Sequence, residues 1–392
     1  MFIPFCKHTV GDEETAEVMD TLKSAWLTTG PKTKQFETEF AEYIGVKHAI
    51  ALNSCTSALH LSLLANGVGP GDEVITTPLT FCATIEAIEY CGARSIFVDV
   101  DERNFHIDAK RIEEKITPNT KCILPVHYGG IPCDLDSINQ IAKNHNLQIV
   151  EDAAHALGTQ YKYQRIGSSG NLTCFSFYPV KNITTGEGGM VTLNDDDKAK
   201  KIRTLALHGM SKDAWQRYAQ QGSWYYEIHH LGYKYNLTDI QASLGICQLK
   251  KLERFNELRE NQAKLYFESL RDCDEISLPS WYYDYFGTLR DEGFVNSWHL
   301  FVIMLNLQQV SITRNELIQE LNEKGIGTSV HFIPVHLQPY YAQKNNLHKG
   351  QFPVAESIFD RIISIPIYPK LTESELLYIT DTLKKILQAN RK

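Results

Sequence analysis

The chain has 392 residues, enough for two domains, and its 43% hydrophobic and 22% charged residues are ordinary for a soluble globular protein. A formal net charge of −8, without a long run of lysine or arginine, argues against nucleic acid as the main partner. The nine scattered cysteines indicate neither a disulfide framework nor a metal site. The sequence shows no signal peptide and no apolar run of the ~18 residues that a membrane-spanning helix needs. We therefore expect a cytoplasmic protein with no membrane association.

Short apolar runs alternate with helical patterns between residues 45 and 195. The predicted strands are His48–Leu52, Glu73–Thr76, Ser95–Asp99, Lys121–Val126, Gln148–Glu151, Leu172–Phe177 and Met190–Leu193. The predicted helices between them are Ser57–Ala65, Cys82–Tyr90, Asp108–Glu114 and Leu135–His145. This alternation predicts an α/β fold whose central sheet is mostly parallel and flanked by helices on both faces. In such sheets, ligands gather at the carboxyl ends of the strands.

The pattern changes after about residue 240. A long amphipathic helix is predicted over 240–266, followed by a loop-rich aromatic stretch over 279–295. A strand at 300–305 and helices near 314–324 and 373–388 complete a smaller C-terminal α+β domain. We therefore expect a large domain over residues 1–250 and a small one over 251–392, with residues 1–30 as a segment that could pack against the small domain.

Three polar features follow predicted strands. In NSCTSALHLSLLA, hydroxyl residues precede a helix, so the backbone N–H groups of Thr56 and Ser57 would form an anion site, although helix caps without a ligand are more frequent. Phe81 in TTPLTFCAT could stack on a flat ring or belong to the core. In VEDAAHA, both Glu151 and Asp152 could present a carboxylate to a ligand, or Asp152 could cap a helix.

The segment FSFYPVKNITTGEGG is the most informative. A strand ends in a polar loop that carries Lys181, and the glycine cluster after it permits close backbone approach. An aldehyde cofactor needs such an amine nucleophile on a loop. An ordinary surface lysine beside a turn is an equal alternative from this segment alone. The anion site at Thr56 and Ser57, the carboxylate of Glu151 or Asp152, and Lys181 together indicate pyridoxal 5'-phosphate. The ring nitrogen of this cofactor requires a carboxylate partner.

The sequence resembles the DegT/StrS family of sugar aminotransferases, of pyridoxal-phosphate fold type I, over almost its whole length. The segments that carry this resemblance are SAWLTTGPKTKQFE, GDEVITTPLTFCATIEAI, VEDAAHALG, FSFYPVKNITTGEGG, LHGM, LGYKYNLTDIQASLG, NSWHLF and GIGTSVHFIPVH. Within the family, KNIT, GYKYNLTDI and SWHLF are most similar to the enzymes that make UDP-4-amino-4-deoxy-L-arabinose.

The resemblance implies a role for each site residue. Lys181 would form the Schiff base and transfer the proton, and Asp152, rather than Glu151, would pair with the pyridine nitrogen. The other cofactor-binding residues would be Thr56, Ser57 and Ser176 at the phosphate, Phe81 and His155 at the ring, and Lys234, which in the family's homodimer would reach the neighbouring subunit's phosphate. Cys55 and Lys234 replace a glycine and an asparagine that are common in the family. Thr29 and His331 are candidates for binding the sugar, although His331 could equally be structural.

Because Lys181 is present, the resemblance favours transamination. The expected reaction moves an amino group from L-glutamate, which leaves as 2-oxoglutarate, to carbon 4 of a nucleotide-linked keto-sugar for surface or secreted glycan biosynthesis. A sugar dehydratase, an amino-acid transaminase and a catalytically silent sugar-binding regulator of the same fold are the alternatives.

Overall fold

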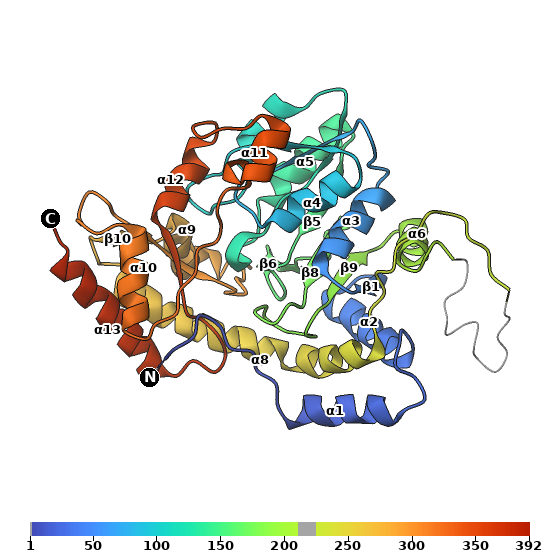
Figure 1. The fold of residues 1–392 in the computed structure, drawn as a ribbon, viewed down its shortest axis with the longest axis horizontal. Coiled ribbons are helices and arrows are strands. Elements are labelled where there is room, and N and C mark those ends of the chain that lie inside the picture. The colour runs from blue at the N-terminus through green and yellow to red at the C-terminus, as the bar shows by residue number, and fades with distance from the viewer. Residues whose placement is uncertain (1, 211–224) are drawn as a thin grey trace.

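The computed structural model describes residues 2–210 and 225–392 (Figure 1). Its largest sheet has seven strands in the order β1–β9–β8–β5–β4–β2–β3. These strands are β1 (His48–Leu52), β2 (Glu73–Thr76), β3 (Arg94–Phe97), β4 (Thr120–Ile123), β5 (Gln148–Asp152), β8 (Leu172–Ser176) and β9 (Gly189–Leu193). Strand β9 is antiparallel to β1 and β8, and the other neighbouring pairs are parallel. The prediction of a mostly parallel sheet is therefore confirmed.

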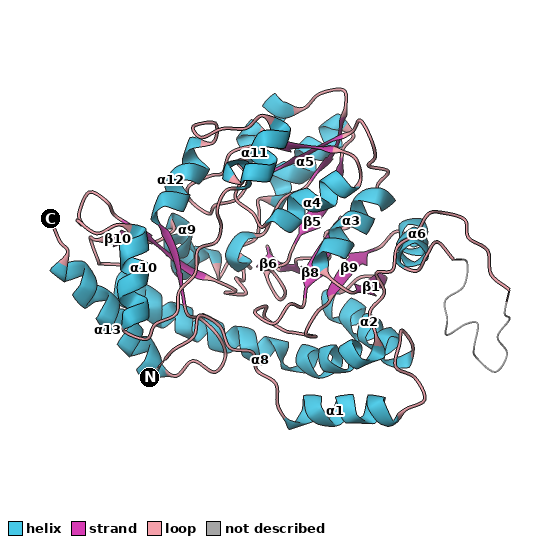
Figure 2. Cartoon of the chain, viewed as in Figure 1, coloured by secondary structure: helices cyan, strands magenta, loops and turns pink. Residues whose placement is uncertain are grey.

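Helices cover both faces of this sheet (Figure 2). One core contains residues of α2 (Pro31–Ile44), α5 (Leu135–His145) and α8 (Asp239–Leu270), and another contains residues of α3 (Cys55–Ala65), α4 (Cys82–Tyr90) and α6 (Asp196–Ala206). Strand residues alternate between the two: Ala49 and Ala51 pack in the first core, and Ile50 and Leu52 in the second. The near-continuous apolar runs of the sequence reflect this burial on both faces.

The C-terminal part contains a small antiparallel sheet of β10 (Ile276–Ser277), β11 (Phe301–Leu305) and β12 (Ile362–Ile365). Around it lie α9 (Ser280–Asp284), α10 (Arg314–Glu323), α11 (Pro339–Asn345), α12 (Pro353–Arg361) and α13 (Glu373–Ala389). The predicted boundary at residue 250 falls inside the continuous helix α8, and the division into two domains stays a prediction. Within residues 2–210 and 225–392, no helix is long and apolar enough to cross a membrane.

The N-terminal segment contacts both the C-terminal part and α8. Ile3 is buried among C-terminal residues, and its backbone N–H donates to the Gly325 carbonyl over 2.7 Å. Helix α1 (Asp12–Lys23) packs against α8, where Lys251 donates to the Glu14 carboxylate over 2.8 Å. The segment thus links the large sheet's helix layer to the C-terminal part.

Two predictions of local structure were wrong. The stretch 108–114 forms two 3₁₀ turns, Ala109–Arg111 and Glu113–Lys115, rather than an α-helix. The Asp108 side chain accepts a bond from the Lys110 N–H, which caps a short turn, and a segment this short gains too few α-helical bonds to offset nucleation. The stretch 279–295, which the sequence predicts to be rich in loops, is partly helical. It contains α9, in which the side chains of Trp281 and Tyr282 are buried.

Candidate active site

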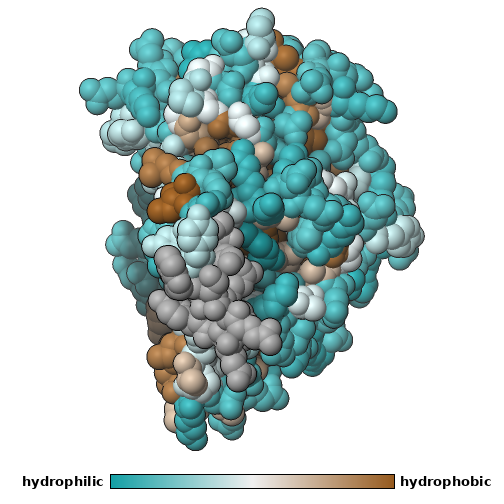
Figure 3. All heavy atoms as spheres, turned by 90° about the vertical axis from the view of Figure 1, so that its right-hand side faces the viewer, coloured by the Kyte–Doolittle hydropathy of each residue, from teal (hydrophilic) through white to brown (hydrophobic). Residues whose placement is uncertain are grey.

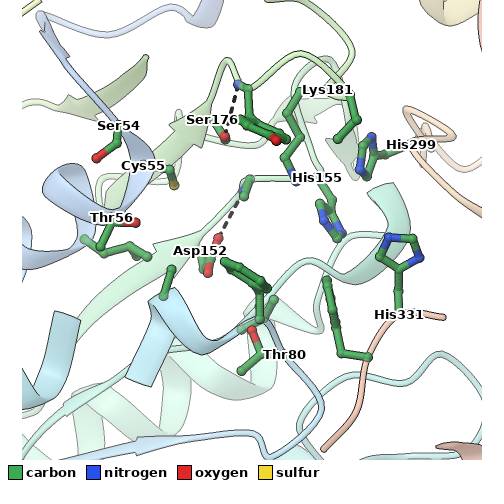
Figure 4. Close-up of a pocket in the computed structure, with 18 of the residues that line it drawn as sticks. Ser54, Cys55, Thr56, Thr80, Asp152, His155, Ser176, Lys181, His299 and His331 are labelled. Atoms are coloured by element: carbon green, nitrogen blue, oxygen red, sulfur yellow. Dashed lines mark hydrogen bonds between the residues drawn. The ribbon is translucent and has the colours of Figure 1, made fainter. Parts of the chain in front are cut away.

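A cavity of about 530 Å³ opens where the carboxyl ends of the parallel strands meet (Figure 4). It contains seven of the ten residues that the sequence predicts for the site: Thr56, Phe81, Asp152, His155, Ser176, Lys181 and His331. Sequence reasoning did not assign a role to several others, including Ser54, Thr80, Tyr178, His299 and Phe332. Three predicted residues, Thr29, Ser57 and Lys234, are not part of the lining.

The start of α3 forms one end of the cavity. Ser54 caps this helix and accepts a hydrogen bond from the Ser57 N–H over 3.1 Å. The Ser57 hydroxyl donates to Asn53 Oδ1 over 2.6 Å, so its side chain supports the cap. A Cβ atom on Gly189 would come within 2.5 Å of the Ser54 carbonyl group, which explains why glycine begins β9 here. The helix terminus, with Thr56 and Ser176 in the same lining, is suited to a phosphate.

The two neighbouring carboxylates of β5 lie in different environments. Asp152 lines the cavity and accepts hydrogen bonds from Thr84 Oγ1 at 2.8 Å and from the Ala154 N–H at 3.1 Å. Glu151 points to the other face, where it bonds His127, Ser169 and Asn171. Period-2 alternation along the strand separates the two side chains, so Asp152 is the carboxylate in contact with the cavity.

Glu151 and His127 form a fully buried pair, 2.9 Å apart. His127 Nδ1 accepts a bond from the Cys133 N–H, so Nε2 carries the proton that is donated to Glu151. Despite burial, the bonds from His127, Ser169 and Asn171 lower the pKa of Glu151. This carboxylate is therefore fully engaged within the protein and has a structural role.

Lys181 faces Asp152 across the cavity, on the loop that follows β8 (Figure 4). Burial lowers the pKa of Lys181 to about 8, although Cys55 and Asp152 nearby act in the opposite direction. The next residue fixes the loop, because Asn182 Nδ2 donates to Asn256 Oδ1 and to the Ser297 carbonyl, both at 2.7 Å. The loop is thus held in place, and the lowered pKa means that the Lys181 amine loses its proton more readily than a surface lysine.

Three histidines form the wall beside Lys181 (Figure 4). The His155 ring lies 4.2 Å from that of His299 and stacks at 5.8 Å on Phe332. His331 Nδ1 is 2.8 Å from the Ser364 hydroxyl. Burial and Lys181 lower the pKa of His331 to about 3, and burial with the same lysine holds the pKa of His155 well below its usual value. These imidazoles are neutral at physiological pH.

The remaining predicted residues lie at or beyond the cavity rim. Phe81 is 60% exposed, and its ring centroid is 6.0 Å from that of Phe332. Lys234 Nζ donates to Asn236 Oδ1 over 2.6 Å, and Asn236 Nδ2 donates to Thr29 Oγ1 over 2.7 Å. Thr29 and Lys234 therefore belong to one polar group outside the lining of this chain's cavity.

The chemistry of the lining fits pyridoxal phosphate. Asp152 is buried, and burial raises its pKa although Ala154, Thr84 and Lys181 lower it. A cationic ring nitrogen would supply the counter-charge that this carboxylate needs. The amine of Lys181 and the helix terminus at Ser54 lie in the same cavity, where they could meet an aldehyde and a phosphate.

A family model for DegT/DnrJ/EryC1/StrS aminotransferases matches residues 8–384. The chain belongs to this family. It is 46% identical over 388 residues to the spore coat polysaccharide biosynthesis protein SpsC of Bacillus subtilis, covering 99% of this chain and 97% of that protein. The predicted family, the pyridoxal-phosphate cofactor and the transaminase activity are therefore confirmed.

Solved structures agree with this assignment. A protein of Streptococcus pneumoniae assigned as a sugar aminotransferase, in its PMP form, matches with a TM-score of 0.90 at 36% identity, covering 99% of both chains. The same protein has also been solved in a PLP form. Helicobacter pylori PseC, an aminotransferase involved in the biosynthesis of pseudoaminic acid, matches with a TM-score of 0.89 at 28% identity over 99% of this chain and 100% of PseC.

Proposed function

We propose that this aminotransferase moves the amino group of L-glutamate to a nucleotide-linked keto-sugar, at carbon 4, in the biosynthesis of a surface or secreted glycan. The observation that carries the proposal is the pairing of Lys181 with Asp152 in one cavity of a family of sugar aminotransferases. SpsC and PseC, which act in polysaccharide and pseudoaminic acid biosynthesis, support a glycan pathway. The finer resemblance to enzymes that make UDP-4-amino-4-deoxy-L-arabinose stays a prediction.

When bound, pyridoxal phosphate supplies an aldehyde for amine exchange and a ring that disperses negative charge. In the proposed cycle, Lys181 Nζ would hold the cofactor's aldehyde, and its free amine would take the proton from the donor's α-carbon. Asp152 would keep the ring nitrogen protonated, and Thr56, Ser57 and Ser176 would hold the phosphate. Lys181 lies on a fixed loop, so its proton transfers are effectively intramolecular.

The ring and sugar contacts complete the proposal. His155 would lie beside the ring, where its neutral imidazole could pack without adding charge. Phe81, at the rim, would close over the ring when the cofactor is bound. His331 would hydrogen-bond the sugar from the opposite wall, and Thr29 would contact it from a neighbouring loop.

We also propose a homodimer in which Lys234 completes the partner's phosphate site. Lys234 is exposed and lies outside its own chain's cavity. Close to it in sequence, Leu231 is 90% exposed and Ile228 is 65% exposed. Figure 3 shows apolar side chains among polar ones on the side of the molecule where α6 lies. Burial of such side chains against a second copy would stabilise the dimer.

The proposed function is tested with a panel of UDP-, dTDP- and GDP-linked keto-sugars, with L-glutamate as donor and product mass as readout. We expect one 4-keto sugar to gain an amino group while 2-oxoglutarate forms in equal amount. A product that has lost water without gaining nitrogen would indicate a dehydratase. Amination of free 2-oxoacids alone would indicate an amino-acid transaminase.

A further inference from the structure

His299 is a cavity residue to which the proposed function gives no role. Its side chain is 4% exposed and lines the cavity together with Lys181. Its Nδ1 atom is buried and has no hydrogen-bond partner within residues 2–210 and 225–392. Since Nδ1 is enclosed by protein, Nε2 is the ring nitrogen available to a ligand in the cavity.

The backbone on both sides of this imidazole is held in place. The Leu300 N–H donates to the Gly129 carbonyl over 3.2 Å, and the Ser297 carbonyl accepts the bond from Asn182 Nδ2. Asn182 directly follows Lys181 in the chain. The position of His299 relative to the catalytic amine is therefore fixed before any substrate binds.

His299 is a neutral hydrogen-bonding group. Its ring lies 4.2 Å from that of His155, whose Nδ1 accepts a bond from the Gly129 N–H over 3.2 Å. Burial, with His155, Lys181 and Arg259, holds the pKa of His299 well below its usual value. Leaving the lone pair on the enclosed Nδ1 places the N–H on Nε2, where it can donate into the cavity.

The charge of the lining matters for substrate choice. Among the described residues that line the cavity, Lys181 carries the only lysine or arginine charge. An aminotransferase of this kind binds an amino acid in one half-reaction and a sugar in the other, at the same site. If an arginine bound the carboxylate of the amino acid, that arginine would be desolvated and unpaired once the sugar replaced the amino acid. A neutral N–H can donate to a carboxylate oxygen and to a hydroxyl oxygen alike.

We propose that His299 Nε2 donates a hydrogen bond to both substrates in turn, to a carboxylate oxygen of the amino-acid donor and to a hydroxyl oxygen of the sugar. The identity of these two substrates rests on the proposed function. His299 is then a neutral donor that lets one site accept two chemically different molecules.

The test uses the holoenzyme and two substitutions. His299→Phe keeps a flat ring against His155 and removes the donor, whereas His299→Gln retains an amide N–H near the Nε2 position. His106→Phe is the matched control, because His106 is a buried histidine that does not line the cavity. Each half-reaction is followed by cofactor absorbance in single turnovers, and calorimetry measures binding of glutarate, an unreactive dicarboxylate.

In His299→Phe we expect the dissociation constants of glutamate, glutarate and keto-sugar each to rise at least about tenfold, with partial recovery in His299→Gln and an unchanged cofactor spectrum. The control should bind all three like the wild type. Provided that the wild type aminates the sugar, the shared role would be overturned if His299→Phe bound only one of the two substrates more weakly. It would also be overturned if the variant bound both substrates as tightly as the wild type. A wild type that aminates no keto-sugar would instead refute the proposed function, and the inference with it.

Discussion

Asp152 and Lys181 approach one cavity from adjacent parallel strands, the first at the end of β5 and the second on the loop after β8. The pairing of the two strands brings a carboxylate and an amine together although they are far apart in sequence. Burial acts on both in the direction of neutrality, because it raises the pKa of Asp152 and lowers that of Lys181. Cofactor binding would give the carboxylate a cationic partner.

Asp152→Asn tests the partner of the ring nitrogen. An opposite charge shifts a neighbouring pKa by about 1–3 units, so its removal should lower kcat by about 10- to 1,000-fold and change the absorbance of bound cofactor. Glu151→Gln is the control, because Glu151 is bonded to His127 on the other face of the strand. That variant should lose stability and keep the cofactor spectrum. The reverse pattern would show that Glu151 is the ring's partner.

The pKa of Lys181 predicts a pH dependence of stability in the cofactor-free protein. Burial lowers this pKa from 10.5 to about 8. Between these values the unfolded chain holds a proton that the folded chain lacks, so stability should rise with pH across this window, by up to about 3 kcal/mol. Below pH 8 both forms are protonated, and the full cost of burying the charge is present.

Urea unfolding of the wild type and Lys181→Met, from pH 7 to 10.5, measures this effect. Other titrating groups cancel in the difference between the two proteins. We expect Lys181→Met to be the more stable at pH 7, with the difference shrinking as pH rises. If the free energies of unfolding of the two proteins changed in parallel with pH, the amine of Lys181 would not be buried as a cation.

Gly189→Ala tests the close packing of β9 against the start of α3. The added Cβ would lie 2.5 Å from the Ser54 carbonyl group and would displace the phosphate end of the cavity. Overpacking of this kind costs about 1–3 kcal/mol, so cofactor affinity should fall roughly 5- to 150-fold. Gly69→Ala, where a Cβ meets no atom within 4 Å, should bind the cofactor normally. Equal affinity in the two variants would contradict the packing argument.

The shared site predicts complementation between inactive subunits. If Lys234 acts across a twofold interface, a mixed dimer of Lys181→Ala and Lys234→Ala contains one intact site and one doubly mutated site. Random exchange in an equal mixture should then restore about a quarter of wild-type activity. Native mass spectrometry verifies the exchange. Mixed dimers without activity would place Lys234 outside the partner's site.

Much of the sheet could be predicted because its signals are local. His48–Leu52 and Glu73–Thr76 are continuous apolar runs of strand length, and their bounds agree with β1 and β2. Helix α5 begins after Asp134, which caps it through the Ser137 N–H. The stretch 108–114 has a helical pattern too, but it is too short for that pattern to decide between an α-helix and 3₁₀ turns.

The cavity was predictable only where motifs marked it. Lys181 and Asp152 stand at strand ends, a position that sequence can indicate. Thr84 and His299 reach the site through tertiary packing, from α4 and from the segment before β11, and composition gives no sign of it. The NSWHLF segment was a family signal without a role for its histidine. Thr29 and Lys234 lie outside this chain's cavity, and in the proposed dimer Lys234 would reach the cavity of the partner.

The most direct test of the account is borohydride reduction of the cofactor-loaded enzyme, followed by proteolysis and mass spectrometry of the peptides. We predict that the reduced cofactor is attached to Lys181, within the FSFYPVKNITTGEGG segment, and that Lys181→Ala yields no reducible adduct. Attachment to any other lysine, or an adduct that persists in Lys181→Ala, would contradict the assignment of Lys181 as the nucleophile.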